Sequence, residues 1–306
     1  MSTNSVLVVG GGFLGRAIAM RLIRAGLRVT VLSPQAETGH WPSGVAVVSG
    51  RQEDRHVMER LIAGQDAVIH AAWGTTPGSS AGHPAIEVER GLNPFLAFLE
   101  TLQRFPEVRL FFLSSGGTVY GEPECLPIAE LAPLQPRSCH GAGKAAAELF
   151  LTACRSTSAS TIILRPSNIY GPGQALRSGF GVVRNMLDCA VEGRLFKLWG
   201  EGSPVRDYLY IDDFVDAVSR LIAAPEASGV FNVGSGAGTS LAELIGIVEA
   251  ETGRHLCIER HPPRTGEVAR VVLDITALSR AVDWKPGVDL ETGVRRTIEW
   301  MREGCR

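Results

Sequence analysis

Short apolar runs alternate with amphipathic stretches through the first half of the chain. Val6–Val9 is an apolar run of the kind that forms a strand buried on both faces. Phe13–Arg24 then places Leu14, Ile18 and Leu22 on one side of a helix. Further strands are predicted at residues 27–32, 45–48, 67–70, 108–113 and 161–164, and further helices at 54–63, 85–104 and 141–156. This alternation predicts an α/β fold with a doubly wound, mostly parallel sheet.

The pattern changes after Pro166. Glycines and prolines interrupt shorter elements there, as in Gly171–Gly173, Gly200–Gly202 and Gly234–Gly236. Helices are still predicted at 181–192, 212–223, 240–251 and 290–302. We therefore expect an N-terminal domain over residues 1–166 and a smaller C-terminal lobe formed mainly by residues 167–306, with some segments able to return to the first domain.

Composition and charge exclude several classes of protein function. Of the 306 residues, 45% are hydrophobic, which is enough for a sizeable core and excludes wholesale disorder. The formal net charge of -2 gives no electrostatic footprint for nucleic acid or for an anionic membrane surface. The first residues show no leader pattern, and the 6 cysteines are spaced singly, without a metal-binding pattern. We expect a cytoplasmic protein with no metal site, no membrane span and no nucleic-acid partner.

A glycine-rich turn joins the first strand to the first helix. Gly10, Gly12 and Gly15 have the spacing G-x-G-x-x-G at the place where a dinucleotide-binding loop belongs. The first glycine allows the tight turn, the second lets a pyrophosphate approach the backbone, and the third lets the helix pack closely against the strand. The helix N-terminus, at Phe13 and Leu14, attracts phosphate. We expect a Rossmann-type domain that binds a nicotinamide dinucleotide.

The end of the second strand leaves the choice between NAD and NADP open. An acidic residue there would hold the ribose hydroxyls of NAD, but the strand ends at Ser33. No arginine follows directly to bind a 2′-phosphate, although Arg16 and Arg51 are candidates. NAD is the cofactor that we expect, with NADP as the alternative.

Seven further segments resemble the extended short-chain dehydrogenase/reductase family that acts on nucleotide sugars, in particular its UDP-glucose 4-epimerase-like members. They follow one another in the family's order over most of the chain. The segments are Ser114–Pro123, Arg165–Gly173, Gly200–Tyr208, Ile211–Asp213, Phe231–Gly236, Arg264–Val268 and Asp283–Pro286. The resemblance implies NAD(P)-dependent chemistry on a UDP- or dTDP-sugar, with 4-epimerisation through a keto intermediate as the expected reaction.

The resemblance also assigns residues to the cofactor, the substrate and a subunit interface. Besides the glycine loop, we expect the cofactor to contact Ser33, Ala71, Ala72, Trp73, Lys144 and Pro166. The nucleotide sugar is expected to contact Asn168, Trp199, Arg206, Tyr208 and Arg264, because paired guanidinium groups suit a diphosphate. Family members often form homodimers through two helices from each subunit, which here correspond to residues 85–104 and 141–156.

The chain departs from the family at the catalytic positions. The family's motif Y-x-x-x-K retains its lysine, Lys144, but His140 replaces the tyrosine. Gly116 stands where the family carries a catalytic serine or threonine, and the hydroxyl groups of Ser115 and Thr118 lie on either side of it. The catalytic residues that we expect are therefore His140, Lys144, Ser115 and Thr118.

His140 admits two interpretations. In the first, its neutral imidazole is the general base, Ser115 or Thr118 supplies a hydroxyl group, and Lys144 lowers the histidine pKa further. In the second, the redox step has been lost and the protein binds cofactor or sugar nucleotide without turnover, which Gly91, in place of the family's asparagine, also favours. A non-redox isomerase that uses His140 for proton transfer, a sugar 4-ketoreductase and a dehydratase are further alternatives.

Overall fold

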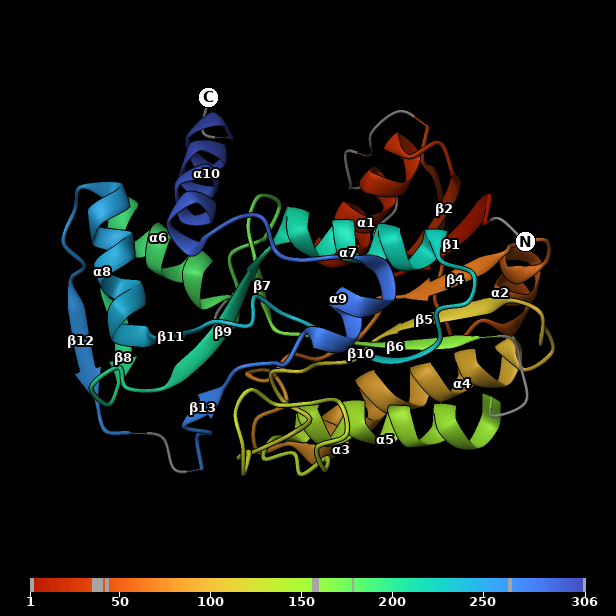
Figure 1. Ribbon diagram of the computed structural model, residues 1–306, viewed down its shortest axis with the longest axis horizontal. Helices are drawn as coiled ribbons and strands as arrows, with labels where there is room; N and C mark the ends of the chain where they lie inside the picture. Colours follow the sequence, from red (N-terminus) through yellow and green to blue (C-terminus); the bar gives the residue numbers. More distant parts are fainter. Residues whose placement is uncertain are drawn as a thin grey trace.

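A parallel sheet forms the centre of the protein (Figure 1). The computed structural model describes residues 3–34, 41, 44–155, 160–177, 179–263 and 266–304, and within them this sheet has seven strands in the order β10-β6-β5-β4-β1-β2-β3. The strands are β1 (Ser5–Val9), β2 (Arg28–Ser33), β3 (Ala46–Ser49), β4 (Ala67–His70), β5 (Arg109–Leu113), β6 (Thr161–Pro166) and β10 (Gly229–Val233). All neighbouring strands run parallel, which confirms the expected doubly wound sheet.

Alternate side chains of the sheet point into two separate cores. In β1, Val6 and Val8 face one core, whereas Leu7 and Val9 face the other. The first core is covered by α1 (Phe13–Arg24), α7 (Ile211–Ala223) and α9 (Thr276–Val282), and the second by α2 (Arg55–Ile62), α4 (Asn93–Leu102) and α5 (Cys139–Arg155). Helices therefore lie on both faces of the sheet, as a buried parallel sheet requires.

The helix predicted at 85–104 is interrupted. The structure divides it into α3 (Pro84–Glu87), a π-helical turn η1 (Val88–Leu92) and α4. Pro94 has no N–H group to donate to the carbonyl of Arg90, so a regular α-helical hydrogen bond is missing there. In the part of the chain that the structure describes, no helix combines the length and the apolar character needed to cross a lipid bilayer.

Short strands that the sequence did not predict build the smaller lobe. They are β7 (Asn168–Tyr170), β9 (Val205–Tyr210), β11 (Gly238–Ser240) and β13 (Arg270–Val271) in one sheet, and β8 (Phe196–Trp199) with β12 (Ile258–His261) in another. Three helices pack with them: α6 (Val182–Glu192), α8 (Leu241–Thr252) and α10 (Leu290–Glu303). Residues after 166 also return to the large sheet, because β10 pairs with β6 and α7 packs against α1.

A buried ion pair fixes α5 to the large sheet. Two nitrogens of the Arg165 guanidinium donate to the Glu148 carboxylate, with a shortest distance of 2.6 Å from Nη2 to Oε2. Ser114 also hydrogen-bonds to Glu148, and Arg165 Nη1 donates to the Tyr120 hydroxyl at 2.8 Å. Because Arg165 lies on β6 and Glu148 on α5, this network sets the position of the helix relative to the sheet.

Removal of the carboxylate at position 148 should destabilise the fold strongly. In Glu148→Ala the Arg165 guanidinium stays buried without its anionic partner, so we expect the free energy of unfolding to fall by about 3–5 kcal/mol. Urea unfolding followed by circular dichroism measures this change. Glu100→Ala, on the exposed side of α4, is the matched control and should change the value by less than about 0.5 kcal/mol. Equal effects of the two substitutions would contradict the role assigned to the pair.

Candidate active site

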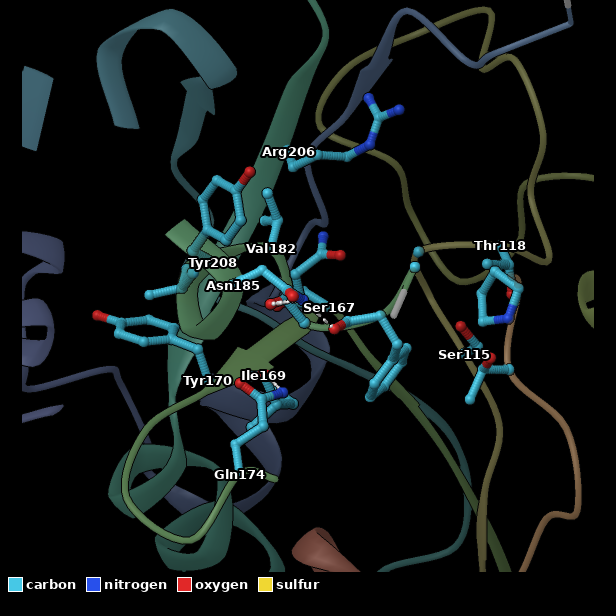
Figure 2. A pocket seen from close by; sticks show the side chains of 18 of the residues that line it. Ser115, Thr118, Ser167, Ile169, Tyr170, Gln174, Val182, Asn185, Arg206 and Tyr208 are labelled. Carbon is cyan, nitrogen blue, oxygen red and sulfur yellow. Dashed lines mark hydrogen bonds between the residues drawn. The ribbon is translucent and has the colours of Figure 1, made fainter. Parts of the chain in front are cut away.

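A cavity of about 840 Å³ lies between the large sheet and the smaller lobe (Figure 2). It is lined by many of the residues expected from the sequence, namely Phe13, Leu14, Ala71, Trp73, Ser115, Thr118, His140, Lys144, Pro166, Asn168, Trp199, Arg206 and Tyr208. Gly10, Gly12, Gly15, Ser33 and Ala72 are not among its lining residues. Arg264 lies outside the described residues. The cavity opens at the carboxyl ends of β4, β5 and β6, where ligands bind in sheets of this kind.

The glycine loop beside the cavity has the shape that a pyrophosphate requires. Gly10 has φ +108°, and a Cβ atom there would lie 2.6 Å from the backbone nitrogen of Ala72. Gly12 caps α1 without a side-chain hydrogen bond, and no acidic residue stands in the first turn of the helix. A Cβ atom at Gly12 would meet nothing within 4 Å. This helix end is therefore free of side-chain competitors and fits the phosphates of a dinucleotide.

Ser33 lies beneath this loop. A Cβ atom at Gly11 would lie 2.9 Å from Ser33 Oγ, so the loop and the end of β2 are in close contact. The guanidinium carbon of Arg16 lies 4.5 Å from the centroid of the Trp41 ring, and Arg51 Nη1 lies 3.8 Å from Glu53 Oε1. Both arginines considered for a 2′-phosphate thus contact other side chains.

The first turns of α5 carry His140 and Lys144 into the cavity. The backbone N–H of Gly141 donates to Ser138 Oγ at 3.1 Å, which caps the start of the helix. His140 and Lys144 are four residues apart and so lie one turn apart on the same side of α5. The ammonium group of Lys144 donates to the carbonyl of Leu113, at the end of β5, at 2.6 Å.

Lys144 is buried with little compensation for its charge. Its Nζ atom lies 3.9 Å from the centroid of the Trp73 ring, a cation–π contact. Burial lowers the pKa of Lys144 to about 7, against the opposing effect of the Glu87 and Glu148 carboxylates. Near neutral pH this lysine is consequently charged in only part of the molecules.

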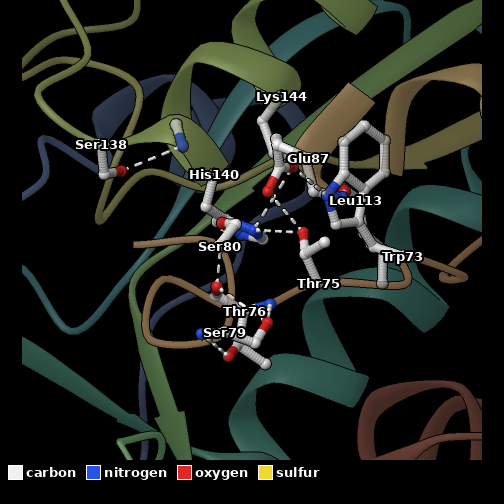
Figure 3. Close-up of polar contacts among 11 residues, drawn as sticks. Trp73, Thr75, Thr76, Ser79, Ser80, Glu87, Leu113, Ser138, His140 and Lys144 are labelled. Atoms are coloured by element: carbon white, nitrogen blue, oxygen red, sulfur yellow. Dashed lines mark hydrogen bonds and ion pairs between the residues drawn. The ribbon is translucent and has the colours of Figure 1, made fainter. Parts of the chain in front are cut away.

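His140 lies close to the carboxylate of Glu87, with Lys144 one helical turn away (Figure 3). Its Nδ1 atom lies 3.3 Å from Thr75 Oγ1 and 3.8 Å from Glu87 Oε1. Burial and, to a smaller extent, the Lys144 charge lower the pKa of His140 to about 4, against the opposing effect of Glu87. Lys144 thus lowers the pKa of His140, as predicted from the sequence. The imidazole is neutral at physiological pH.

Sequence reasoning missed Glu87, although it lies at the centre of the site. Its carboxylate is buried and accepts hydrogen bonds from Thr75 Oγ1 at 2.6 Å and from the indole N–H of Trp73 at 2.8 Å. Burial acts to raise the pKa of Glu87, but hydrogen bonds from Thr75, Ser80 and Trp73 outweigh it, and the pKa is lowered. The sequence does contain one indication of this residue. Glu87 stands four residues before Gly91, so the two positions share one side of the predicted helix.

The two glycines at family catalytic positions stand where a side chain would collide with neighbours. A Cβ atom at Gly116 would lie 2.6 Å from Leu273 Cδ1 and 2.8 Å from the carbonyl oxygen of Arg165. At Gly91 it would lie 2.8 Å from the Trp73 indole and 2.9 Å from Glu87 Oε1. The space that the family's side chains would occupy is therefore filled by other residues of this chain.

Hydroxyl groups remain on the cavity wall next to His140. Ser115 and Thr118 both line the cavity. Thr118 Oγ1 is buried and has no hydrogen-bond partner among the described residues. A buried hydroxyl without a partner is costly, and a ligand oxygen in the cavity would satisfy it.

On the substrate side, the expected residues are ordered by contacts within the protein. Asn168 Nδ2 donates to the carbonyl of Asp207 at 3.0 Å. The Arg206 guanidinium donates to the Val205 carbonyl at 2.9 Å and lies 3.4 Å from Glu267 Oε1. The Trp199 ring stacks on His261 with centroids 5.3 Å apart. Apolar residues that the sequence did not indicate complete this wall, namely Leu176, Phe180, Leu195 and Phe196.

Comparisons with known proteins agree with the motif resemblance over the whole chain. The model of the NAD dependent epimerase/dehydratase family matches residues 6–234. A putative UDP-glucose 4-epimerase of Methanocaldococcus jannaschii is 31% identical, and the match covers 98% of this chain and 99% of that protein. The UDP-glucose 4-epimerase of Thermotoga maritima, solved with UDP-glucose, has a TM-score of 0.90 and 30% identity, covering 99% and 100% of the two chains. The Thermus thermophilus UDP-glucose 4-epimerase, solved with NAD, has a TM-score of 0.88 and 30% identity, covering 97% and 99%.

A serine at position 116 should not fit this site. In Gly116→Ser the new Cβ atom meets Leu273 and a backbone oxygen, so we expect the free energy of unfolding to fall by about 1–3 kcal/mol. Gly117→Ser is the control, because a Cβ atom there meets nothing closer than 4.0 Å. In a Leu273→Ala background the loss caused by Gly116→Ser should shrink. A serine at 116 that leaves thermal and urea unfolding unchanged would contradict the packing.

Proposed function

Because the chain belongs to the NAD dependent epimerase/dehydratase family, we propose that it epimerises a UDP- or dTDP-sugar at C4 through a keto intermediate. The observation that supports this most is the single cavity wall on which His140, Lys144 and the hydroxyl groups of Ser115 and Thr118 meet. The glycine loop, which ends at Gly15, lies beside the same cavity. Proteins of similar sequence and fold that are named UDP-glucose 4-epimerases support the choice of reaction.

In the proposed reaction His140 takes the place of a tyrosine base. NAD, when bound, supplies the acceptor for a hydride from the sugar carbon. His140 accepts the proton of the hydroxyl group on that carbon, and Ser115 or Thr118 donates a hydrogen bond to the same oxygen. An imidazole is neutral at physiological pH, so it needs no neighbouring cation to become a base.

The other side of the cavity would bind the nucleotide diphosphate. Arg206 donates to the Val205 carbonyl and to Glu267 Oε1, and its remaining N–H groups would bind a phosphate. Trp199 and Tyr208 supply aromatic surface for the base and the sugar. Asn168 lines the cavity and would contact the diphosphate through its amide oxygen, since its Nδ2 atom already donates to the carbonyl of Asp207.

We expect the native protein to interconvert the two configurations of the sugar 4-hydroxyl group in an NAD-dependent reaction. We expect His140→Ala to lose this activity. Removal of the base should lower kcat by about 10²–10⁴-fold. His255→Ala is the matched control, because that side chain is 97% exposed, and it should retain full activity. Conversion of UDP-glucose and dTDP-glucose is followed by chromatography, and NAD released by denaturing the purified protein is measured enzymatically.

The products separate the proposal from its rivals. A reductase or dehydratase would release a reduced or dehydrated product in place of the epimer. Turnover without a transient absorbance of reduced nicotinamide would indicate a non-redox isomerase. Protein that carries no NAD and gains no thermal stability from UDP, dTDP or their sugars would contradict the proposal altogether.

We further propose that the protein is a homodimer that uses α5. In α4, the other helix expected at this interface, the large apolar side chains are buried against the protein's own sheet, namely Phe95, Phe98, Leu99 and Leu102. The exposed side of α5, however, is apolar: Leu149 is 66% and Phe150 43% exposed, in line with exposed Ala142 and Ala153. An apolar stripe on a surface helix is a common subunit contact.

Charge on this stripe should separate the subunits. We expect light scattering to give a mass of about twice 32.7 kDa for the native protein and 32.7 kDa for the double variant Leu149→Glu/Phe150→Glu. Leu131→Glu, at a side chain 98% exposed outside the stripe, should leave the dimer intact. A native protein that is monomeric at micromolar concentration would refute the interface.

A further inference from the structure

A chain of hydrogen bonds leads from Glu87 through Thr75 to His140 (Figure 3). The Thr75 hydroxyl donates to Glu87 Oε2 at 2.6 Å, and the same oxygen lies 3.3 Å from His140 Nδ1. Thr75 comes from the loop after β4, Glu87 from α3 and His140 from the first turn of α5. Three separate segments therefore converge on one edge of the imidazole.

The direction of each hydrogen bond in this chain is determined. A carboxylate accepts hydrogen bonds and donates none, so the only proton of the Thr75 hydroxyl points to Glu87. Thr75 then has lone pairs alone to offer to His140, which means that Nδ1 carries the proton of the neutral imidazole. The other ring nitrogen, Nε2, is left with the basic lone pair. Among the described residues none hydrogen-bonds to Nε2, and His140 lines the cavity.

We propose that Glu87 and Thr75 are positioning residues that hold His140 in the Nδ1–H tautomer, with Nε2 directed to the substrate. This inference rests on the proposed function, in which His140 is the base. In the proton step the O–H bond of the sugar hydroxyl breaks and a bond between that proton and Nε2 forms. The electron pair stays on the sugar oxygen and becomes the second bond of the carbonyl as the C4–H bond breaks, for whose hydride bound NAD would be the acceptor. The second proton of the resulting imidazolium remains on Nδ1, facing Thr75, with the Glu87 anion 3.8 Å away.

The neighbours of Glu87 hold its carboxylate in one orientation. The indole of Trp73 can only donate, and it occupies Oε1 at 2.8 Å. A Cβ atom at Gly143 would lie 2.6 Å from Glu87 Oε1, and one at Gly91 would lie 2.9 Å from it. The glycines of η1 and α5 thus leave just enough room for the carboxylate. Gly91, which departs from the family pattern, is required by this arrangement.

The charges around His140 act in opposite directions. Glu87, from α3, favours the imidazolium, whereas Lys144, from α5, disfavours it, and burial disfavours it most. Glu87 is therefore the group that keeps His140 from becoming a still weaker base. The relay both orients the ring and stabilises the charge that forms on it, as the carboxylate of a catalytic triad does.

Glu87→Gln provides a sharp test, because Trp73 dictates how the new amide must lie. The indole N–H requires an acceptor, so the amide oxygen of the variant faces Trp73 and the NH₂ group faces Thr75. Thr75 then accepts from the amide and donates to His140 Nδ1. The neutral imidazole should change to the Nε2–H tautomer, and the lone pair needed for proton transfer would be lost from the cavity side.

The tautomer is measured directly by ¹⁵N NMR of the protein, labelled at histidine and with its bound NAD, at neutral pH. The His140 signals are assigned by their absence in His140→Ala. We expect a protonated Nδ1 and an unprotonated Nε2 in the native protein and the reverse in Glu87→Gln. We also expect kcat to fall by about 10²–10⁴-fold, with KM changed less than about threefold. The midpoint of imidazole protonation, about 4 in the native protein, should move lower.

Conservative variants distinguish a loss of His140 orientation from a general loss of structure. Thr75→Ser keeps the hydroxyl group and should keep the native tautomer and most of kcat, whereas Thr75→Val should lose both. Glu89→Gln and Thr152→Val are the matched controls, since both side chains are exposed and away from the cavity. They should leave the NMR signals and kcat unchanged.

The NMR measurement tests the orientation of His140, and the kinetic measurement tests its role as the base, so the two proposals can be refuted independently. An Nε2–H tautomer in the native protein, or an unchanged tautomer in both Glu87→Gln and Thr75→Val, overturns the relay whether or not turnover is found. A reversed tautomer with unchanged kcat overturns the positioning role, because His140 would then not be the base. Absence of turnover in the native protein refutes the proposed function, while the tautomer still decides whether Glu87 and Thr75 orient the ring.

Discussion

A buried carboxylate decides how the catalytic end of the molecule is packed. Glu87 is 2% exposed, and a charge at that depth is tolerable only when hydrogen bonds satisfy its oxygens. The loop after β4 must therefore place Trp73 and Thr75 as donors, and the two helices that approach the carboxylate must carry Gly91 and Gly143 where they do so. A shift of α5 or η1 towards Glu87 would close the space that its carboxylate occupies, so the positions of these helices and of the carboxylate depend on one another.

The departures from the family's catalytic pattern are physically connected. Taken singly, Gly91, Gly116 and His140 suggest lost catalytic groups. In the structure the side chain missing at Gly91 makes room for Glu87, and the space beside Gly116 is filled by Leu273. Protein interiors are close-packed and buried polar groups need partners, which the Glu87 carboxylate finds in Trp73 and Thr75. The two glycines therefore fit the side chains packed around them, Glu87 and Trp73 at Gly91 and Leu273 at Gly116.

Local patterns allowed the fold and half of the site to be predicted. The strand–turn–helix at Gly10 is encoded within a few residues, and the four-residue spacing of His140 and Lys144 places them on one helix face. The short strands of the smaller lobe were missed, because β7, β11 and β13 have two or three residues each and depend on pairing with β9. Thr75 and Glu87 were missed for a similar reason: Thr75 meets His140 across 65 residues of sequence, and no local pattern records such a contact.

The histidine base that we propose changes the task expected of the neighbouring lysine. A phenol, with a pKa near 10, becomes a base near neutral pH only with the help of a cation. An imidazole needs no such help, and the Lys144 ammonium only weakens it, since burial and Lys144 together bring the pKa of His140 to about 4. The requirement is then stabilisation of the imidazolium, which the Glu87 anion supplies. Lys144 opposes that effect least when it is neutral, and its own pKa of about 7 makes the neutral form available at physiological pH. Its ammonium group contacts the Trp73 ring and donates to the Leu113 carbonyl at the end of β5, on the wall of the cavity.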